Sequence, residues 1–424
     1  MPSLRVLGGG REVGRAALLV EDRGKALLDY GVNFDEKDRP QIPLHVRPME
    51  LNLVAISHAH LDHIGATPLL YITGRPRIFT TRPTLEIARL LVLDFLKLNS
   101  ANIDYEYSEF VKMSENAQLV DYGSEVEVDG FKLIFMNAGH ILGSSMIYLE
   151  TPSGHRILYT GDVNTIQTWT LSGAELWPLK VDTLIIESTY GSRIHPPRYR
   201  VEKRFVSVVE EVISGGGVVL IPSFSVGRSQ EVLTILANEL PYVDIYVDGM
   251  ARDICGIYLQ YQKYLRDPTL YTRALERVTF IKNARDRKKA LSKPGVIIAT
   301  AGMLKGGPSL QYLKKLADDP KNAVLLVSYQ APNSPGHKLL EEGKLEEVEV
   351  YFTKARLEWF DFSSHAGRDG LVDIAKSYSQ TVRNVVVIHG DEESAAGLAG
   401  AIKNTIGGDL NIVAPANGDS ITLD

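Results

Sequence analysis

Short apolar runs that close on turn residues fill the first third of the chain, where they predict β-strands. The predicted strands are 4–8, 16–21, 25–31, 51–57, 131–139, 145–150, 155–162 and 181–188. Apolar positions at helical spacing predict helices over 61–72 and 83–98. The run at 181–188 is almost continuously apolar, which is typical of a strand that is covered on both faces.

After about residue 192, helical and extended patterns alternate strictly. Predicted helices at 199–214, 229–240, 250–265 and 308–316 are interleaved with predicted strands at 216–223, 243–249, 278–281, 295–302 and 323–330. This alternation is typical of a parallel sheet with helices on both faces. The tail adds a helix near 368–378, a strand at 383–390 and a helix near 392–405. The sequence therefore predicts an α/β protein with at least two layered modules.

The composition narrows the class of protein. A length of 424 residues exceeds one ordinary domain, and 44% hydrophobic and 23% charged residues are normal for a globular chain. The net charge, 46 minus 52 or −6, does not indicate a protein that binds nucleic acid through a general basic field. A single cysteine, Cys255, excludes a disulfide framework and a Cys-rich zinc site. With neither a signal peptide nor a membrane-length apolar run, we expect a soluble, cytoplasmic protein.

The densest cluster of candidate ligands is His58-Ala59-His60-Leu61-Asp62-His63, directly after the predicted strand 51–57. Residues two apart in an extended segment point the same way, so His58 and His60 can bind one ion. Asp62 and His63 lie at the turn into the next helix and can reach a second ion. Nitrogen and carboxylate ligands without thiolate suit zinc, with manganese or iron as alternatives. The competing interpretation is a polar loop with incidental histidines.

Two more strand ends carry candidate ligands. His140 in NAGHILGS and Asp162 in YTGDVN each follow a predicted strand and stand beside glycines, which allow close approach of the backbone. Asp162 is the natural carboxylate to bridge two cations. Asp29, in LLDYG, either orients a ligand histidine from the second shell or caps a turn.

Taken together, these motifs resemble the metallo-β-lactamase superfamily. The motifs IIESTYG (185–191), IPSFSVGRSQE (221–231), ATAGML (299–304), FSSHAG (362–367) and VVIHG (386–390) narrow the resemblance to its β-CASP family. Within that family, the chain is most similar to the nuclease subunit of the cleavage and polyadenylation factor in its short archaeal and bacterial forms. HxHxDH alone specifies only the superfamily, whereas the ordered set of motifs specifies the family and spans essentially the whole chain.

The resemblance implies an αββα metallo-β-lactamase sandwich, formed by 1–191 and 361–424, into which a β-CASP domain is inserted as 192–360. It also implies two zinc ions per chain, one held by His58, His60 and His140, the other by Asp62, His63 and His389, with Asp162 bridging them. Such a pair of cations acidifies a water and stabilises charge on phosphate oxygens.

The resemblance also implies catalytic roles. Besides Asp62, the predicted catalytic residues are His365, as the general acid for the leaving oxygen, and Glu187, as the carboxylate that holds this imidazole protonated. The alternatives are a buried core histidine and a solvated strand-end carboxylate. A histidine at position 389 goes with the RNA-processing members of the family, which favours RNA as the substrate.

Candidate substrate contacts lie in the inserted segment. Ser223 precedes the predicted helix 229–240 and is either a phosphate contact or a plain N-cap. Arg228 either contacts phosphate or faces solvent, and Lys305 is a flexible basic candidate. GGGREVG (8–14) lacks the third glycine of a dinucleotide fingerprint, so a nicotinamide role is not expected.

The sequence thus predicts a zinc-dependent ribonuclease that hydrolyses phosphodiester bonds of single-stranded RNA in processing or decay. Endonucleolytic cleavage and 5′-to-3′ exonucleolytic digestion both stay open. Other candidates are a small-molecule hydrolase of the thioester type, a DNA-directed β-CASP nuclease, and a scaffold without catalytic activity. The resemblance further suggests a homodimer.

Overall fold

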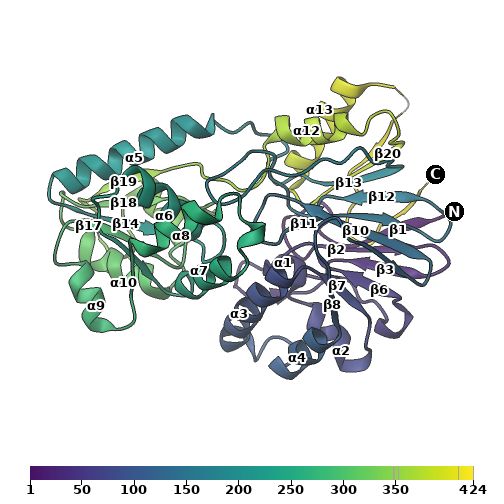
Figure 1. Ribbon diagram of the computed structural model, residues 1–424, viewed down its shortest axis with the longest axis horizontal. Coiled ribbons are helices and arrows are strands. Elements are labelled where there is room, and N and C mark those ends of the chain that lie inside the picture. The colour runs from purple at the N-terminus through teal and green to yellow at the C-terminus, as the bar shows by residue number, and fades with distance from the viewer. Residues whose placement is uncertain (347–348, 352, 409, 424) are drawn as a thin grey trace. The chain divides into compact units, whose positions relative to one another are not determined.

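The computed structural model describes residues 1–346, 349–351, 353–408 and 410–423 (Figure 1). Its chain forms two compact units. The first consists of 1–167, 173–194 and 365–424, and the second of 168–172 and 195–364. The described residues leave out 347, 348, 352, 409 and 424, which belong to the predicted ranges 192–360 and 361–424. The predicted domain ranges stay a prediction.

The first unit contains two seven-stranded sheets. One has the order β22 (Ser420–Thr422), β1 (Ser3–Gly8), β2 (Ala17–Glu21), β3 (Lys25–Leu28), β6 (Leu53–Ala55), β7 (Ile78–Thr80), β8 (Ala117–Leu119). The other has the order β21 (Asn411–Val413), β20 (Asn384–Ile388), β13 (Thr183–Glu187), β12 (Arg156–Tyr159), β11 (Ser145–Glu150), β10 (Phe131–Asn137), β9 (Glu125–Val128). A two-stranded pair, β4 (Asn33–Phe34) and β5 (Pro40–Gln41), stands apart from both sheets.

The main core of this unit lies between the two sheets. Leu18 and Leu28 of one sheet and Phe135 and Ile147 of the other belong to a single buried cluster. A second buried cluster joins the outer face of the β20–β13 sheet to α12 (Arg368–Ser377) and α13 (Glu392–Ile406). Beside β6, β7 and β8 lie the helices that connect these strands (Figure 1), namely α1 (Leu61–Ile64), α2 (Leu70–Thr73), α3 (Arg82–Asn99) and α4 (Tyr107–Glu115). The layers are therefore α, β, β and α, and the predicted sandwich is confirmed.

The prediction of one helix over 61–72 is wrong. Helix α1 ends at Ile64, and a 3₁₀ turn at Thr67–Leu69 separates it from α2. The amide of Ala66 donates to the carbonyl of Tyr30 at 2.9 Å rather than to a preceding helical turn. Pro68 has no amide hydrogen to continue the ladder. The apolar spacing there reflects burial of a segment that bonds to the loop after β3, not a continuous helix.

A buried ion pair links β12 to the start of β13 and provides a test of stability. Asp182 accepts from Nε and Nη2 of Arg156, both at 2.8 Å. Burial alone would raise the pKa of Asp182, but the bonds from Arg156 outweigh it and lower the pKa to about 2. At pH values above the ordinary pKa of an aspartate, the pair therefore stabilises the folded state. This contribution to the free energy of unfolding disappears as the pH falls through about 2.

We expect Asp182→Asn to lower the free energy of unfolding by about 2 kcal/mol at pH 7, and the deficit to shrink toward pH 2. Thermal unfolding of both proteins between pH 2 and 7 measures this difference. Asp129→Asn is the matched control, because Asp129 forms a solvent-exposed pair with Arg77 and should change stability little. Parallel acid profiles for wild type and Asp182→Asn would contradict the assignment.

The second unit is built on a six-stranded sheet in which every pair is parallel. Its order is β16 (Val278–Phe280), β15 (Ile245–Asp248), β17 (Gly295–Ala299), β14 (Val218–Pro222), β18 (Ala323–Leu326), β19 (Arg356–Trp359). The helices are α5 (Arg198–Ser214), α6 (Arg228–Glu239), α7 (Ala251–Gln260), α8 (Pro268–Glu276), α9 (Ala284–Ala290), α10 (Gly307–Leu316) and α11 (Pro335–Glu342). A buried cluster joins β14, β15, β17 and β18 to α10 and α11. The predicted parallel α/β module is confirmed.

The segment 168–172 packs in the second unit because Glu231 of α6 binds it. The buried Glu231 carboxylate accepts the amides of Trp169 and Thr170, each at 3.0 Å, and the hydroxyl of Thr170 at 2.9 Å. Arg198 donates to the same carboxylate at 2.8 Å. No sequence pattern in 168–172 marks this segment as separate, so its place in the second unit was not predicted.

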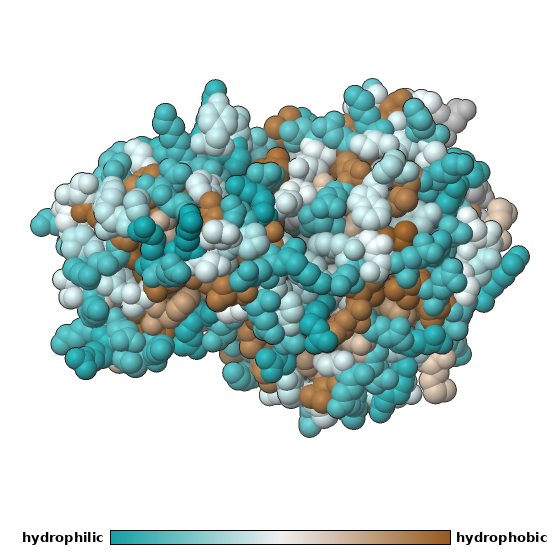
Figure 2. Space-filling view, viewed as in Figure 1, coloured by the Kyte–Doolittle hydropathy of each residue, from teal (hydrophilic) through white to brown (hydrophobic). Residues whose placement is uncertain are grey.

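Hydrophilic residues predominate on the face of the molecule drawn in Figure 2, with apolar residues dispersed among them. Within the described ranges, every helix is too short or too polar to cross a bilayer.

Candidate metal centre

Three histidines of the first unit face one another just beyond strand ends. His58 and His60 follow β6, and His140 follows β10. Nδ1 of His60 lies 3.2 Å from Nε2 of His58 and 3.1 Å from Nε2 of His140. Burial lowers the pKa of all three imidazoles, to about 3 for His60, so each ring is neutral at pH 7. Neutral imidazole is the form that binds metals, and three such nitrogens converge here.

A second group of side chains surrounds His63. Its Nε2 is 3.2 Å from Oδ1 of Asp162, and Nδ1 of His389 is 3.1 Å from the same oxygen. Nε2 of His389 is 3.5 Å from Oδ2 of Asp62 and accepts the amide of Gly14 at 3.1 Å. Burial alone would lower the pKa of His389, but the charge of Asp162 outweighs it and raises this pKa to about 10. A strong negative potential therefore acts on this group.

Asp162 lies between the two groups. Its Oδ2 is 3.4 Å from Nε2 of His58 and 3.6 Å from Nε2 of His140, whereas its Oδ1 faces His63 and His389. Burial by itself raises the pKa of this carboxyl, but the surrounding histidines lower it well below its usual value. An ionised carboxylate with one oxygen toward each group has the geometry of a bridge between two cations.

The donor atoms fit a metal centre. Nε2 of His63 and Oδ1 of Asp162 are buried, and neither has a hydrogen-bond partner among the described residues although they lie 3.2 Å apart. A cation held between them satisfies both atoms. Ligand-type atoms within 4.8 Å of one another form four overlapping sets: His58, His60, His140, Asp162; His58, Asp62, His63; His63, Asp162, His389; and Asp162, Glu187, His365. This cluster can bind metal, and its nitrogen and oxygen donors suit zinc.

Asp29 holds the histidines from behind. Its Oδ2 is 2.7 Å from Nδ1 of His63 and accepts the hydroxyls of Ser57 and Tyr159, both at 2.7 Å. Ser57 Oγ in turn lies 3.0 Å from Nδ1 of His58. One buried carboxylate thus orients rings of both groups, as outer-shell carboxylates do in metal sites. The supporting roles of Ser57 and Tyr159 were not predicted, although Ser57 directly precedes His58 in the chain.

The backbone around the cluster leaves no room for larger residues. A Cβ on Gly161, whose φ is +52°, would lie 2.7 Å from Cβ of Ser57. A Cβ on Gly31 would lie 1.8 Å from the carbonyl oxygen of Asp62. His389 itself has a φ of 51°, a left-handed conformation that costs a non-glycine residue about 1 kcal/mol. The strained residue is thus the one whose imidazole lies beside Asp162.

Glu187 and His365 form a pair beside the cluster. Nδ1 of His365 is 3.0 and 3.1 Å from the two carboxylate oxygens of Glu187, which also accepts the amide of Val163 at 2.7 Å. Nε2 of His365 is 4.0 Å from Oδ2 of Asp162. Burial alone would lower the pKa of His365, but Glu187 and Asp162 outweigh it and raise this pKa. The ring therefore keeps its proton to higher pH than an ordinary imidazole, and Nε2 lies on the side of the cluster.

Three of these side chains reach solvent. His60, Asp62 and His365 are partly exposed, while His58, His63, His140 and Asp162 are buried. The cluster is therefore reached by solvent through these three side chains, one of which is His365.

The candidate substrate contacts belong to the second unit. Ser223 is buried, and Gly227, not Ser223, is the N-cap of α6, so the N-cap alternative is wrong. Arg228 is also buried and donates to the carbonyl of Val327, which excludes the alternative that it only faces solvent. Lys305 is exposed in the turn before α10. Phosphate binding by the three residues stays a prediction.

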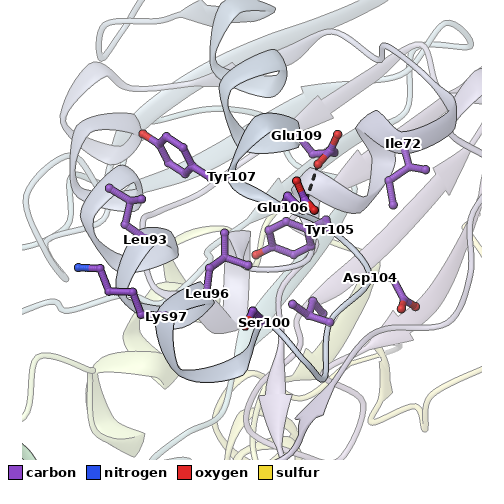
Figure 3. Close-up of a pocket in the computed structure, with 11 residues that line it drawn as sticks. Ile72, Leu93, Leu96, Lys97, Ser100, Asp104, Tyr105, Glu106, Tyr107 and Glu109 are labelled. Carbon is purple, nitrogen blue, oxygen red and sulfur yellow. Dashed lines mark hydrogen bonds between the residues drawn. The ribbon is translucent and has the colours of Figure 1, made fainter.

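A separate cavity of about 690 Å³ lies among α2, α3 and α4 (Figure 3). Leu93, Leu96 and Tyr105 contribute apolar surface, and Glu106 and Glu109 are hydrogen-bonded to each other through a capping box. None of the predicted site residues lines it. The described residues that line it include no histidine, so the candidate chemistry belongs to the histidine cluster.

Known protein families share this two-unit architecture. Three family models match: the metallo-β-lactamase superfamily domain over 18–188, the Beta-Casp domain over 229–339, and the Zn-dependent metallo-hydrolase RNA specificity domain over 353–415. A crystal structure of a protein of unknown function from Enterococcus faecalis V583 aligns over 99% of both chains, with a TM-score of 0.60 at 12% identity. That likeness concerns the fold alone.

Relatives are much more similar in sequence. RNase aCSPSF2 of Saccharolobus solfataricus is 46% identical, with 99% of this chain and 85% of the relative covered. Probable RNase MJ4 of Methanocaldococcus jannaschii is 37% identical, covering 92% and 93%, and transcription termination factor FttA of Pyrococcus horikoshii is 35% identical, covering 98% and 70%. The fold and the site define a metallo-β-lactamase type of hydrolase. The chain belongs to the β-CASP family of this superfamily.

Proposed function

We propose that this β-CASP protein is a ribonuclease that hydrolyses single-stranded RNA with two zinc ions. A metal-dependent ribonuclease is the activity that the family and the relatives named as RNases support. The observation that carries the finer proposal is the position of Asp162, whose two carboxylate oxygens each face a separate group of histidines. His58, His60 and His140 would hold one ion, and Asp62, His63 and His389 the other.

When bound, the metal ions supply Lewis acidity for the phosphate oxygens and acidify a water. The chain supplies the remaining chemistry. Asp62, partly exposed beside His389, stands where it can orient the attacking water. Glu187 holds Nδ1 of His365, so the proton on Nε2 is available to the leaving oxygen. Asp29 fixes the ring of His63 through Nδ1 and leaves Nε2 for the cluster.

The alternatives lack a specific observation in their favour. A thioester-type hydrolase needs neither the Glu187–His365 pair nor the second unit. A scaffold does not require buried, converging nitrogen atoms, which are costly without a cation. A histidine at 389 argues against a DNA-directed member, because in the family a histidine at this position goes with RNA processing and an aliphatic residue with DNA. We further propose that the metallo-β-lactamase domain consists of 1–191 and 361–424 and that the β-CASP domain consists of 192–360. We also propose that the protein is a homodimer, and light scattering can measure its mass in solution.

Metal removal tests the proposed function. We expect dialysis against a chelator to abolish cleavage of an unstructured RNA labelled at each end, and two equivalents of Zn²⁺ per chain to restore it. Elemental analysis of the protein as purified should then find two zinc ions. Full activity in the chelated protein, or purification without zinc, would contradict the proposal.

The same assay distinguishes the mode of cleavage. Substrates carrying a 5′-triphosphate, monophosphate or hydroxyl are digested in parallel. Mononucleotides released only from monophosphorylated ends identify an exonuclease. Internal fragments that do not depend on the 5′ end identify an endonuclease.

A further inference from the structure

Two half-exposed aromatic rings lie at the carboxyl edge of the parallel sheet in the second unit. Trp359 is the last residue of β19 and is 46% exposed, and Tyr329, shortly after β18, is 47% exposed. The two strands pair directly, with Leu326 of β18 opposite Trp359. This aromatic platform, Trp359 and Tyr329, therefore stands at the edge where open α/β sheets bind their ligands.

The backbone that carries the platform is held by hydrogen bonds. Nε1 of Trp359 donates to the carbonyl of Ser328 at 3.1 Å. Nε2 of Gln330 donates to the same carbonyl and to that of Gly302, both at 3.0 Å. The residues on both sides of Tyr329 are thus tied to the neighbouring strand ends. A ligand that stacks on rings supported in this way loses little free energy to ordering of the protein.

Other aromatic residues of the unit are buried, partly buried or, like Tyr199, Tyr242 and Tyr351, exposed elsewhere. Tyr246, Tyr258, Tyr271 and Tyr312 are buried in the core, at 2% exposure or less. Single exposed aromatics need no explanation, but here two stand at the ends of paired strands and bring exposed ring surface to one edge of the sheet. Arg228, whose guanidinium is fixed on the carbonyl of Val327, places a positive charge one residue before Ser328. Rings together with a cation are the features on which single-stranded nucleic acid stacks and is retained.

We propose that Trp359 and Tyr329 are a base-stacking subsite for unpaired nucleotides of the RNA substrate. This assignment rests on the proposed ribonuclease function. Stacking is sequence-tolerant because every base has a π-face. It also suits a chain of net charge −6, whose overall field does not attract phosphate. In the sequence, five residues lie between Trp359 and His365.

The test measures binding of a 12-nucleotide RNA to the zinc-loaded protein at low temperature by fluorescence anisotropy, in parallel with an abasic scan of the same RNA. We expect Trp359→Ala to weaken binding about 5- to 150-fold, and Trp359→Phe to retain most of the affinity. One abasic position should weaken binding to the wild type by a similar factor and cause no further loss in Trp359→Ala. The salt dependence should not change, because no phosphate contact is removed.

Tyr242→Ala is the matched control. Tyr242 is 64% exposed but precedes β15, at the amino edge of the same sheet, so its removal should leave binding unchanged. Wild-type binding with an unaffected Trp359→Ala variant would overturn the subsite and leave the ribonuclease proposal intact. The subsite would also be overturned if Trp359→Ala weakened the binding of every abasic RNA by the same factor. If the wild type neither binds nor cleaves RNA, the proposed function fails and the subsite fails with it.

Discussion

Asp162→Asn is expected to lower RNA cleavage by about 10³-fold or more and to reduce the bound zinc below two ions per chain. The substitution removes the negative charge that lies within 3.6 Å of ring nitrogens of His58, His63, His140 and His389. It also introduces an amide with one oxygen instead of two, so the side chain can no longer face both groups with equivalent atoms. Elemental analysis and kcat/KM on the same preparation measure both effects.

Asp182→Asn is the appropriate control for Asp162→Asn. Asp182 is also a buried aspartate of the first unit, but its partner is Arg156 and it is not part of the metal cluster. We expect Asp182→Asn to lose stability and keep zinc and activity below its unfolding temperature. Two zinc ions retained by Asp162→Asn would show that this carboxylate is not a bridge.

His365→Ala is expected to keep both zinc ions and lower kcat by about 10²- to 10⁴-fold. Nδ1 of His365 is held by Glu187 rather than by the cluster, so removing the ring deletes a proton donor and no proposed ligand. Because His365, Glu187 and Asp162 also form a ligand-type set, metal content is the decisive measurement. Loss of zinc from His365→Ala would identify the residue as a ligand.

The Glu187–His365 pair also predicts a pH dependence. Burial lowers the pKa of His365, but the charge of Glu187 outweighs it, so the protonated ring persists to higher pH. A general acid is active when protonated, and activity therefore falls as the pH rises through this pKa. In Glu187→Gln, the alkaline fall should move to lower pH while the metal content stays at two ions. An unchanged alkaline limb in Glu187→Gln would contradict the role of this carboxylate.

Much of the architecture was predictable because local patterns agree with it. The continuous apolar run at 181–188 predicts a covered strand, and β13 is an interior strand of its sheet, between β12 and β20. Strict alternation after 192 predicts a parallel sheet, which the second unit has. The helix α4 was not predicted. The apolar spacing at 61–72 wrongly predicted one continuous helix, because the amide of Ala66 bonds to Tyr30 instead of continuing a helix.

The site was predictable to the extent that its residues stand at strand ends. His58, His140 and Asp162 follow β6, β10 and β12, and the two sheets bring these ends together. Local sequence does not indicate the supporting contacts, because they join residues far apart in the chain. Tyr159 donates to Asp29 across 130 positions, and Gly14 donates to His389 across 375.

By itself, the sequence determined the family, the α/β class and the cluster of candidate ligands, since motif order and apolar periodicity are properties of the chain. Only the tertiary structure decided that Nδ1 of His389 faces Asp162, that Asp29 orients His63 directly and His58 through Ser57, and that Trp359 and Tyr329 share one edge of a sheet. Ring orientation and strand neighbours depend on the three-dimensional packing of distant segments, and periodicity along one segment carries no information about them.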